Sequence, residues 1–319
     1  MRARTLCALA AAVGIAIAAD PPYRYFVTGN PADVQKKTTA GFALVGGGKD
    51  QDAVGRWFLK RSGGGDVVVI RASGADGYNE YFKGLADVDS VETLVIATPE
   101  AARDPFVAEK IRKAEALFIA GGDQWNYMRV WKGRPVQEAV QSLVDRGVPV
   151  GGTSAGLAVL SEYVYTAEHD TVTSAQALVD PFDERVTVGR DFVRIPILKG
   201  AITDMHFRAR DRMGRTLAFL ARMGGGKAIA VDEKTAVLAD ADGSSVVEGE
   251  GFAYFIRKRE KAEVCERGRP LTYKGISVYR VSRGGRFDVS KWAGSGGVSY
   301  ELNVEGGVIR STQAGGAVY

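Results

Sequence analysis

Five short apolar runs, rich in β-branched residues, recur between residues 41 and 154, and each ends in a turn of glycine, proline or small polar residues. They are residues 42–45, 66–70, 93–97, 116–120 and 149–152. Runs that are apolar at successive positions must be buried on both faces, which is typical of strands in a parallel sheet. This pattern constrains the rest of the fold more than any other feature of the chain.

The segments between these runs have apolar residues near the helical spacing of 3.6. They are residues 53–61, 78–85, 105–113 and 135–146. The clearest stripe is formed by Val136, Val140, Leu143 and Val144, and Gly147 closes it. Alternating strands and helices predict an α/β fold with a doubly wound, mostly parallel sheet. In such a fold, ligands bind beyond the carboxyl ends of the strands, where the glycine turns lie.

The pattern changes after about residue 240, where short strand-like pieces alternate with glycine, aspartate and serine turns. The pieces are residues 237–239, 246–247, 253–256, 276–281 and 299–304. We therefore expect a catalytic α/β domain over residues 19–240 and a β-rich C-terminal extension over residues 241–319, packed on that domain.

The N-terminus has the pattern of a signal peptide. Arg2 and Arg4 precede an uncharged run over residues 6–19, and Ala16 and Ala18 supply small residues at the spacing of a cleavage site. A buried N-terminal helix is the alternative interpretation. We predict that residues 1–18 are a signal peptide and that the mature protein is exported to the periplasm or the medium, with no attachment to a membrane after cleavage.

Composition is that of an ordinary globular protein. With 319 residues, 45% of them hydrophobic and 25% charged, the chain is not a disordered, collagen-like or multi-span membrane protein. The formal charge of +4 falls to +2 once Arg2 and Arg4 are removed, so nucleic acid is not an expected partner. Cleavage leaves Cys265 as the only cysteine, and no Cys/His spacing suits a metal. We expect no disulfide, no metal and no cofactor.

Residues 152–156, Gly-Thr-Ser-Ala-Gly, fit the nucleophile-elbow pattern between an expected strand and an expected helix. The sharp turn exposes the Ser154 hydroxyl, and the flanking glycines avoid collisions with the strand and the helix. The alternative is a glycine turn with an inert serine.

A catalytic serine needs a base, and the chain has two histidines. His169 lies in a polar segment and reads as a solvated loop residue, whereas His206 lies in the strand-like stretch 202–208.

An imidazole base needs a carboxylate partner. The apolar run 228–231 is followed by Asp232 and Glu233, and either can serve, or both can simply face water. The oxyanion needs two backbone N–H groups. One is expected from Ala155 and the other from the glycine turn 121–124.

Several arginines follow His206 and suggest an acidic substrate, although a helix start that faces solvent would have the same composition. They are Arg208, Arg210, Arg212 and Arg215.

Four motifs, taken together and in this order, resemble the cyanophycinases. They are residues 121–124 (GGDQ), 151–156 (GGTSAG), 204–207 (DMHF) with the arginines after it, and 231–236 (VDEKTA). Cyanophycinases are serine peptidases related to peptidase E, an aspartyl dipeptidase, and the resemblance implies their flavodoxin-like fold, similar to class I glutamine amidotransferases. It covers roughly residues 41–240.

The resemblance implies roles for individual residues. Ser154 corresponds to the nucleophile, His206 to the general base and Glu233 to its acidic partner, while Gly122 and Ala155 correspond to the oxyanion donors. Positions associated with substrate binding are Gln124, Asp204, Arg210, Arg212 and Arg215. The chain departs from the family at Met205, where an amide that could bind substrate is replaced by a thioether.

The sequence thus predicts an exported serine peptidase that hydrolyses bonds next to aspartyl residues, in cyanophycin or in β-aspartyl peptides. Its expected partners are an acidic peptide or a cyanophycin-like polymer and, in a homodimer, a second copy of the chain. Two alternatives stay open. One is an esterase of the α/β-hydrolase kind, in which the acid would precede the histidine in the chain. The other is a non-catalytic exported protein that binds acidic peptides.

Overall fold

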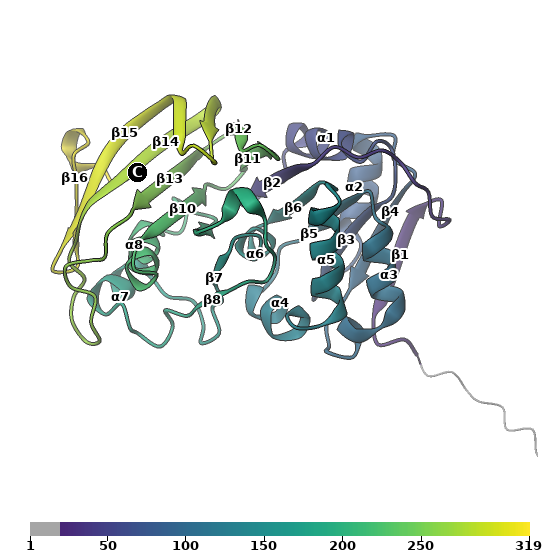
Figure 1. The fold of residues 1–319 in the computed structure, drawn as a ribbon, viewed down its shortest axis with the longest axis horizontal. Helices are drawn as coiled ribbons and strands as arrows, with labels where there is room; N and C mark the ends of the chain where they lie inside the picture. Colours follow the sequence, from purple (N-terminus) through teal and green to yellow (C-terminus); the bar gives the residue numbers. More distant parts are fainter. Residues whose placement is uncertain (1–19) are drawn as a thin grey trace, which may run out of the picture.

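The computed structural model describes residues 20–319, so the predicted signal peptide, residues 1–18, lies outside the described residues. The described strands form one sixteen-stranded sheet, and helices cover its two faces. Figure 1 shows the helices α1 to α5 gathered around one half of the molecule and the long strands of the C-terminal region around the other.

The five apolar runs form the parallel centre of the sheet, as predicted. They are β2 (Gly41–Val45), β3 (Val67–Arg71), β4 (Ser90–Val95), β5 (Ala116–Ile119) and β6 (Val150–Thr153). Their order is β4-β3-β5-β6-β2, with every neighbouring pair parallel. A further strand, β1 (Arg24–Gly29), pairs antiparallel with β4 at the edge. Sequence patterning did not predict β1, because an edge strand with no buried residue lacks the apolar run of the others.

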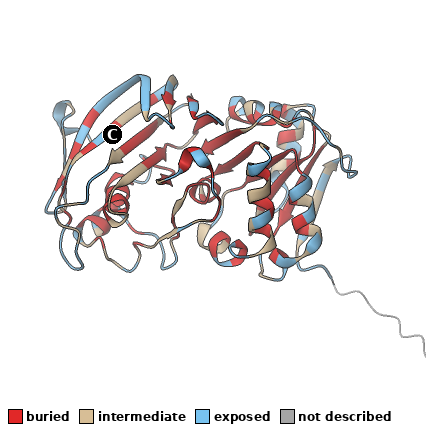
Figure 2. Cartoon of the chain, in the orientation of Figure 1, coloured by how far each residue is buried: buried red, intermediate tan, exposed pale blue. Residues whose placement is uncertain are grey.

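Both faces of this centre are buried, which explains the continuous apolar runs. In β2, Leu44 belongs to one core cluster and Ala43 to another on the opposite face. Figure 2 shows the central strands in the colour of buried residues. Five helices cover them, the fourth of which was not predicted. They are α1 (Asp52–Lys60), α2 (Gly77–Leu85), α3 (Pro105–Lys113), α4 (Gln124–Trp131) and α5 (Pro135–Asp145).

The chain after β6 builds a second group of elements around its own core cluster. Its strands are β7 (Tyr163–Tyr165), β8 (Val188–Arg190), β9 (Ala201–Asp204) and β10 (Gly226–Val231). Strands β7, β9 and β10 run parallel to one another. Its helices are α7 (Ser174–Val179) and α8 (Met213–Arg222), whereas the short α6 (Ala155–Ala158) packs in the core of the first group. The 3₁₀ turns η1 (Ala101–Arg103), η2 (Pro196–Leu198) and η3 (Ala314–Gly316) lie elsewhere in the chain.

The remaining strands are antiparallel and join the two groups edge to edge. They are β11 (Thr235–Asp240), β12 (Ser244–Gly249), β13 (Phe252–Lys258), β14 (Tyr273–Asp288), β15 (Ala293–Glu305) and β16 (Val308–Ser311). Strand β11 pairs with β2, β13 pairs with β10, and β12 and β14 complete the path between them. The strand-rich C-terminal region therefore continues the sheet. No helix within residues 20–319 has both the length and the apolar character needed to cross a membrane.

Candidate active site

Three side chains from distant parts of the chain meet at the carboxyl ends of β6, β9 and β10. The Ser154 hydroxyl lies 2.8 Å from Nε2 of His206. Nδ1 of His206 lies 2.6 Å from Oε1 of Glu233. Because a carboxylate only accepts hydrogen bonds, Nδ1 donates to Glu233 and Nε2 is left to accept the proton of Ser154. The structure brings together the three residues that the resemblance named.

Ser154 lies in a strained turn between β6 and α6. Its φ of 53° and ψ of −118° are outside the conformations that residues with a side chain usually adopt. A Cβ on Gly152 would approach the backbone of Gly156 to 2.6 Å, and one on Gly156 would approach the carbonyl oxygen of Ile119 to 2.0 Å. The glycines on both sides are therefore required by packing, which is the reason expected from the sequence.

His206 is held in place by its own backbone and by its surroundings. Its φ is 46°, and its backbone N–H donates to the carbonyl of Gly46 at 2.8 Å. Burial is the largest effect on its pKa and lowers it, the nearby charges of Arg210 and Arg212 lower it further, and the bond to Glu233 opposes them. The pKa falls below the ordinary value, which favours a neutral imidazole that can accept a proton.

The two acids that follow β10 have different tasks. Glu233 reaches His206, whereas Asp232 accepts hydrogen bonds from the backbone N–H groups of Arg208 and Phe252, at 2.9 and 3.1 Å. Asp232 thus fastens the loop after His206 to strand β13. The residue pattern alone fits either acid, and the geometry assigns the contact with the imidazole to Glu233.

The end of β2 and the glycine turn after it contact the three segments that carry Ser154, His206 and Glu233. Ser154 N–H donates to the carbonyl of Val45, His206 N–H to that of Gly46, and Lys234 N–H to that of Gly47. Gly47 has a φ of 92°, and a Cβ there would lie 2.5 Å from the His206 ring. The sequence pattern identified this turn only as the end of a strand. Its three consecutive glycines were the available signal.

A cavity of about 390 Å³ opens over Ser154. Gly122 lines it, on the turn between β5 and α4, and Ala155 begins α6 beside Ser154. The cavity wall includes both cationic and acidic groups. The cationic side chains are Arg210, Arg212 and Arg215, and the acidic ones are Asp123, Glu168 and Asp170. No group of three or more potential metal-binding side chains occurs in the described part of the chain.

The residues associated with substrate binding do not all face this cavity. Gln124, Arg210, Arg212 and Arg215 line it, and the amide of Gln124 donates to the carbonyl of Tyr165 at 3.3 Å. Asp204 lies beneath the cavity with 1% of its surface exposed.

Asp204 forms a bidentate pair with Arg215, at 2.9 Å to Nε and 2.5 Å to Nη2. Thr216 donates to the same carboxylate at 2.9 Å, and Arg212 lies 3.5 Å away. Burial alone would raise the pKa of Asp204, but the charges of Arg215 and Arg212 outweigh it and hold that pKa below its usual value. Asp204 is therefore an ionised counter-charge that fixes Arg212 and Arg215 in the cavity wall.

Comparison with known proteins shows what the whole chain is similar to. The model of the family described as "Peptidase family S51" matches residues 72–247, just over half of the chain. The cyanophycinase of Trichormus variabilis is 26% identical over 266 residues, which cover 78% of this chain and 86% of that protein. The cyanophycinase of Synechococcus elongatus is 26% identical over 289 residues, covering 82% and 86%.

The fold has a counterpart among solved structures. A peptidase from an acI-B1 actinobacterium superposes with a TM-score of 0.55 at 16% identity, over 80% of this chain and 98% of that one. This likeness supports the α/β architecture around the site.

We predict that Gly47→Ala disables the site while the fold persists. The new Cβ would displace the His206 ring, and a displacement of about 1 Å at a catalytic group costs roughly 100-fold in rate. The measurement is the rate at which a fluorophosphonate probe labels Ser154. Gly84→Ala, on α2 where a Cβ meets nothing within 4 Å, is the matched control and should label at the wild-type rate. Equal labelling of both variants would contradict the prediction.

We predict that Asp204→Asn lowers the free energy of unfolding by about 3–5 kcal/mol, because it leaves Arg215 buried without its counter-charge. Urea unfolding followed by fluorescence measures the change. Asp240→Asn removes an ion pair with Arg61 in which the acid is half exposed, so it should cost less than about 1 kcal/mol. Similar losses for the two variants would be evidence against a buried, ionised Asp204.

Proposed function

Because the chain belongs to peptidase family S51, and is therefore a serine-type peptidase, we propose that it hydrolyses peptide or isopeptide bonds next to aspartyl residues with Ser154, His206 and Glu233 as its catalytic triad. The observation that carries this proposal is the continuous hydrogen-bond chain from the Ser154 hydroxyl through His206 to Glu233.

The geometry suggests a complete sequence of proton transfers. Ser154 Oγ attacks the substrate carbonyl while Nε2 of His206 accepts its proton, and Glu233 stabilises the resulting imidazolium. Backbone N–H groups of Gly122 and Ala155 stabilise the oxyanion. His206 then returns the proton to the leaving amine, and water hydrolyses the acyl-enzyme by the same route.

The cavity wall favours a substrate with carboxylate groups. The exposed Arg210 guanidinium can bind a carboxylate through paired hydrogen bonds. Arg212 and Arg215 add positive charge beside it, although Asp204 balances part of that charge. Acidic groups of the same wall, among them Glu168, can bind a cationic side chain. Relatives named cyanophycinase make cyanophycin the first polymer to test. At Met205 the thioether supplies no strong hydrogen bond, so we expect the arginines to provide most of the recognition.

We also propose export of the mature protein, based on the signal-peptide pattern of residues 1–18. N-terminal sequencing of protein recovered from the periplasm or the medium tests this proposal. A mature N-terminus at residue 19 is expected, and retention of Met1 in a cytoplasmic protein would refute it.

Substitution of the triad tests the activity. Ser154→Ala and His206→Ala should each lower kcat for a β-aspartyl dipeptide by about 10⁴-fold, because the nucleophile and its base act as a unit. His169→Ala, at the exposed second histidine outside the cavity over Ser154, is the matched control and should retain kcat for the same dipeptide within about twofold. The assay is mass spectrometry of products from cyanophycin and from α- and β-aspartyl peptides. Full hydrolysis by Ser154→Ala would refute the triad.

The pH dependence of kcat/KM tests the base. A free imidazole has a pKa of about 6.5, and burial together with Arg210 and Arg212 lowers the pKa of His206 below that value. Since only the neutral imidazole accepts the proton of Ser154, the acid limb of the profile should lie below about pH 6.5. Arg210→Gln removes a positive charge and should move this limb to higher pH. A limb at or above pH 7 in the wild type would contradict the assignment.

A further inference from the structure

A second cavity, larger than the first, adjoins the candidate active site. Its volume is about 650 Å³, and it shares Trp125 and Glu168 with the cavity over Ser154. Each cavity alone is of a size that suits one small ligand. Because they share two wall residues, the two cavities are neighbours, and a chain longer than the first cavity would reach the second. We call the second cavity the outer groove.

Elements far apart in the sequence build the outer groove. Helix α4 contributes Met128 and Arg129, Lys132 follows the end of that helix, and β8 contributes Val188 and Gly189. Further lining residues come from the segment after α7, from the end of α8 and from the C-terminal region. These residues are Phe182, Asp183, Glu184, Arg222 and Arg267.

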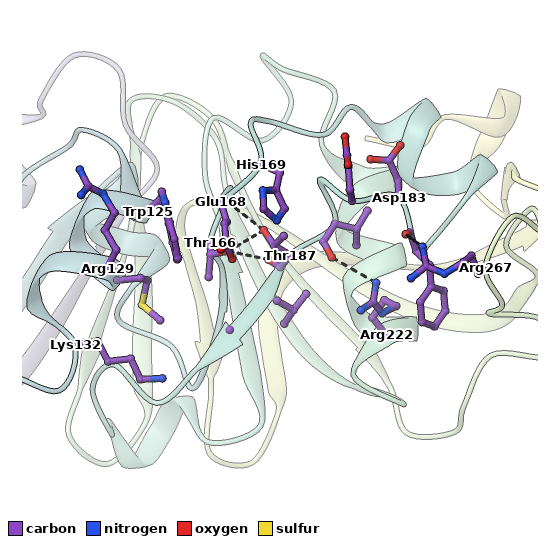
Figure 3. A pocket seen from close by; sticks show the side chains of 16 residues that line it. Trp125, Arg129, Lys132, Thr166, Glu168, His169, Asp183, Thr187, Arg222 and Arg267 are labelled. Carbon is purple, nitrogen blue, oxygen red and sulfur yellow. Dashed lines mark hydrogen bonds between the residues drawn. The ribbon is translucent and has the colours of Figure 1, made fainter.

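Cationic groups lie at both ends of the outer groove. Figure 3 shows Arg129 and Lys132 at one end and Arg222 and Arg267 at the other. Within residues 20–319, none of these four forms an ion pair with a carboxylate. Their hydrogen bonds instead go to neutral oxygens, as in the 2.6 Å bond from Lys132 to the carbonyl of Arg190.

Acidic groups lie between and beside these cations. Glu168 and Glu184 are exposed in the outer groove, and neither forms an ion pair with a cation among the described residues. Asp183, in contrast, is neutralised by Arg185 at 2.7 Å. The outer groove thus offers four positive and two negative charges without ionic partners. This mixture suits a ligand that carries several carboxylates together with cationic side chains.

We propose that the outer groove is a second substrate subsite, which binds the part of an acidic peptide polymer that extends beyond the residues held over Ser154. Carboxylates of the polymer contact Lys132 and Arg267, and its cationic side chains contact Glu168 and Glu184. This inference rests on the proposed peptidase function. It also gives the C-terminal region a part in substrate binding, because Arg267 comes from the segment between β13 and β14.

The test compares substrates of two lengths, a synthetic β-aspartyl-arginine dipeptide and a chain of four such units. We expect the wild-type kcat/KM to be about tenfold higher for the longer chain, mainly through KM. The double variant Lys132→Glu/Arg267→Glu should remove most of this advantage, because it places repulsive charges at both ends of the groove. Dipeptide hydrolysis, which needs only the first cavity, should change by less than about twofold.

A matched control separates the groove from general effects of charge. Arg269→Glu reverses an exposed charge two residues from Arg267 that does not line the groove, and it should retain the preference for the longer chain. The proposal is refuted if the wild type shows no preference, if the double variant affects both substrates equally, or if Arg269→Glu acts like the double variant.

Binding to an inactive enzyme distinguishes failure of the groove from failure of the catalytic assignment. Calorimetric titration of Ser154→Ala with the four-unit chain should give a Kd about tenfold lower than titration of the triple variant Ser154→Ala/Lys132→Glu/Arg267→Glu. If this difference is found while the wild type hydrolyses neither peptide, the groove stands and the proposed activity fails. Equal Kd values would refute the groove even in an active enzyme.

Discussion

The position of the His206 imidazole depends on a single glycine turn. Carbonyl groups of Val45, Gly46 and Gly47 accept hydrogen bonds from Ser154, His206 and Lys234, so one short segment fastens the loops that carry all three polar side chains. Only a residue without a side chain can lie against the imidazole ring, since a Cβ on Gly47 would come within 2.5 Å of it. Backbone contacts therefore help to set the distances from Ser154 and Glu233 to the imidazole, and they provide the rigid support that a functional site needs.

A second buried interaction, between Asp204 and Arg215, fixes the position of a positive charge in the cavity wall. A buried pair of this kind contributes little net stability, but it fixes the guanidinium group where a free arginine would sample many conformations. The loop above it is held at its end by Tyr319, whose hydroxyl accepts from Met213 N–H at 2.9 Å and donates to Asp211 at 2.7 Å. Arg212 and Arg215 are thus held in fixed positions in the cavity wall, beside the exposed Arg210.

The sequence predicts some parts of this arrangement and not others. Buried parallel strands were recognisable because both of their faces are apolar, and the elbow around Ser154 because its glycines have a steric purpose. Residue patterning could not choose between Asp232 and Glu233, since both follow the same strand and only tertiary contacts separate them. The outer groove was beyond prediction for the same reason, because its walls come from five separate segments.

The C-terminal strands help to position Glu233, although most of their residues lie far from the active site. In the sheet, β12, β14 and β13 lie between β11 and β10, yet in the chain only residues 232–234 separate β10 from β11. The five strands must therefore curl until the carboxyl end of β10 meets the start of β11, beside β2. Glu233 lies in that three-residue connection, so the curl brings it to His206. Strands after residue 240 are thus part of the framework that positions the acid, and Asp232, bonded to Phe252 of β13, is the direct link between the two.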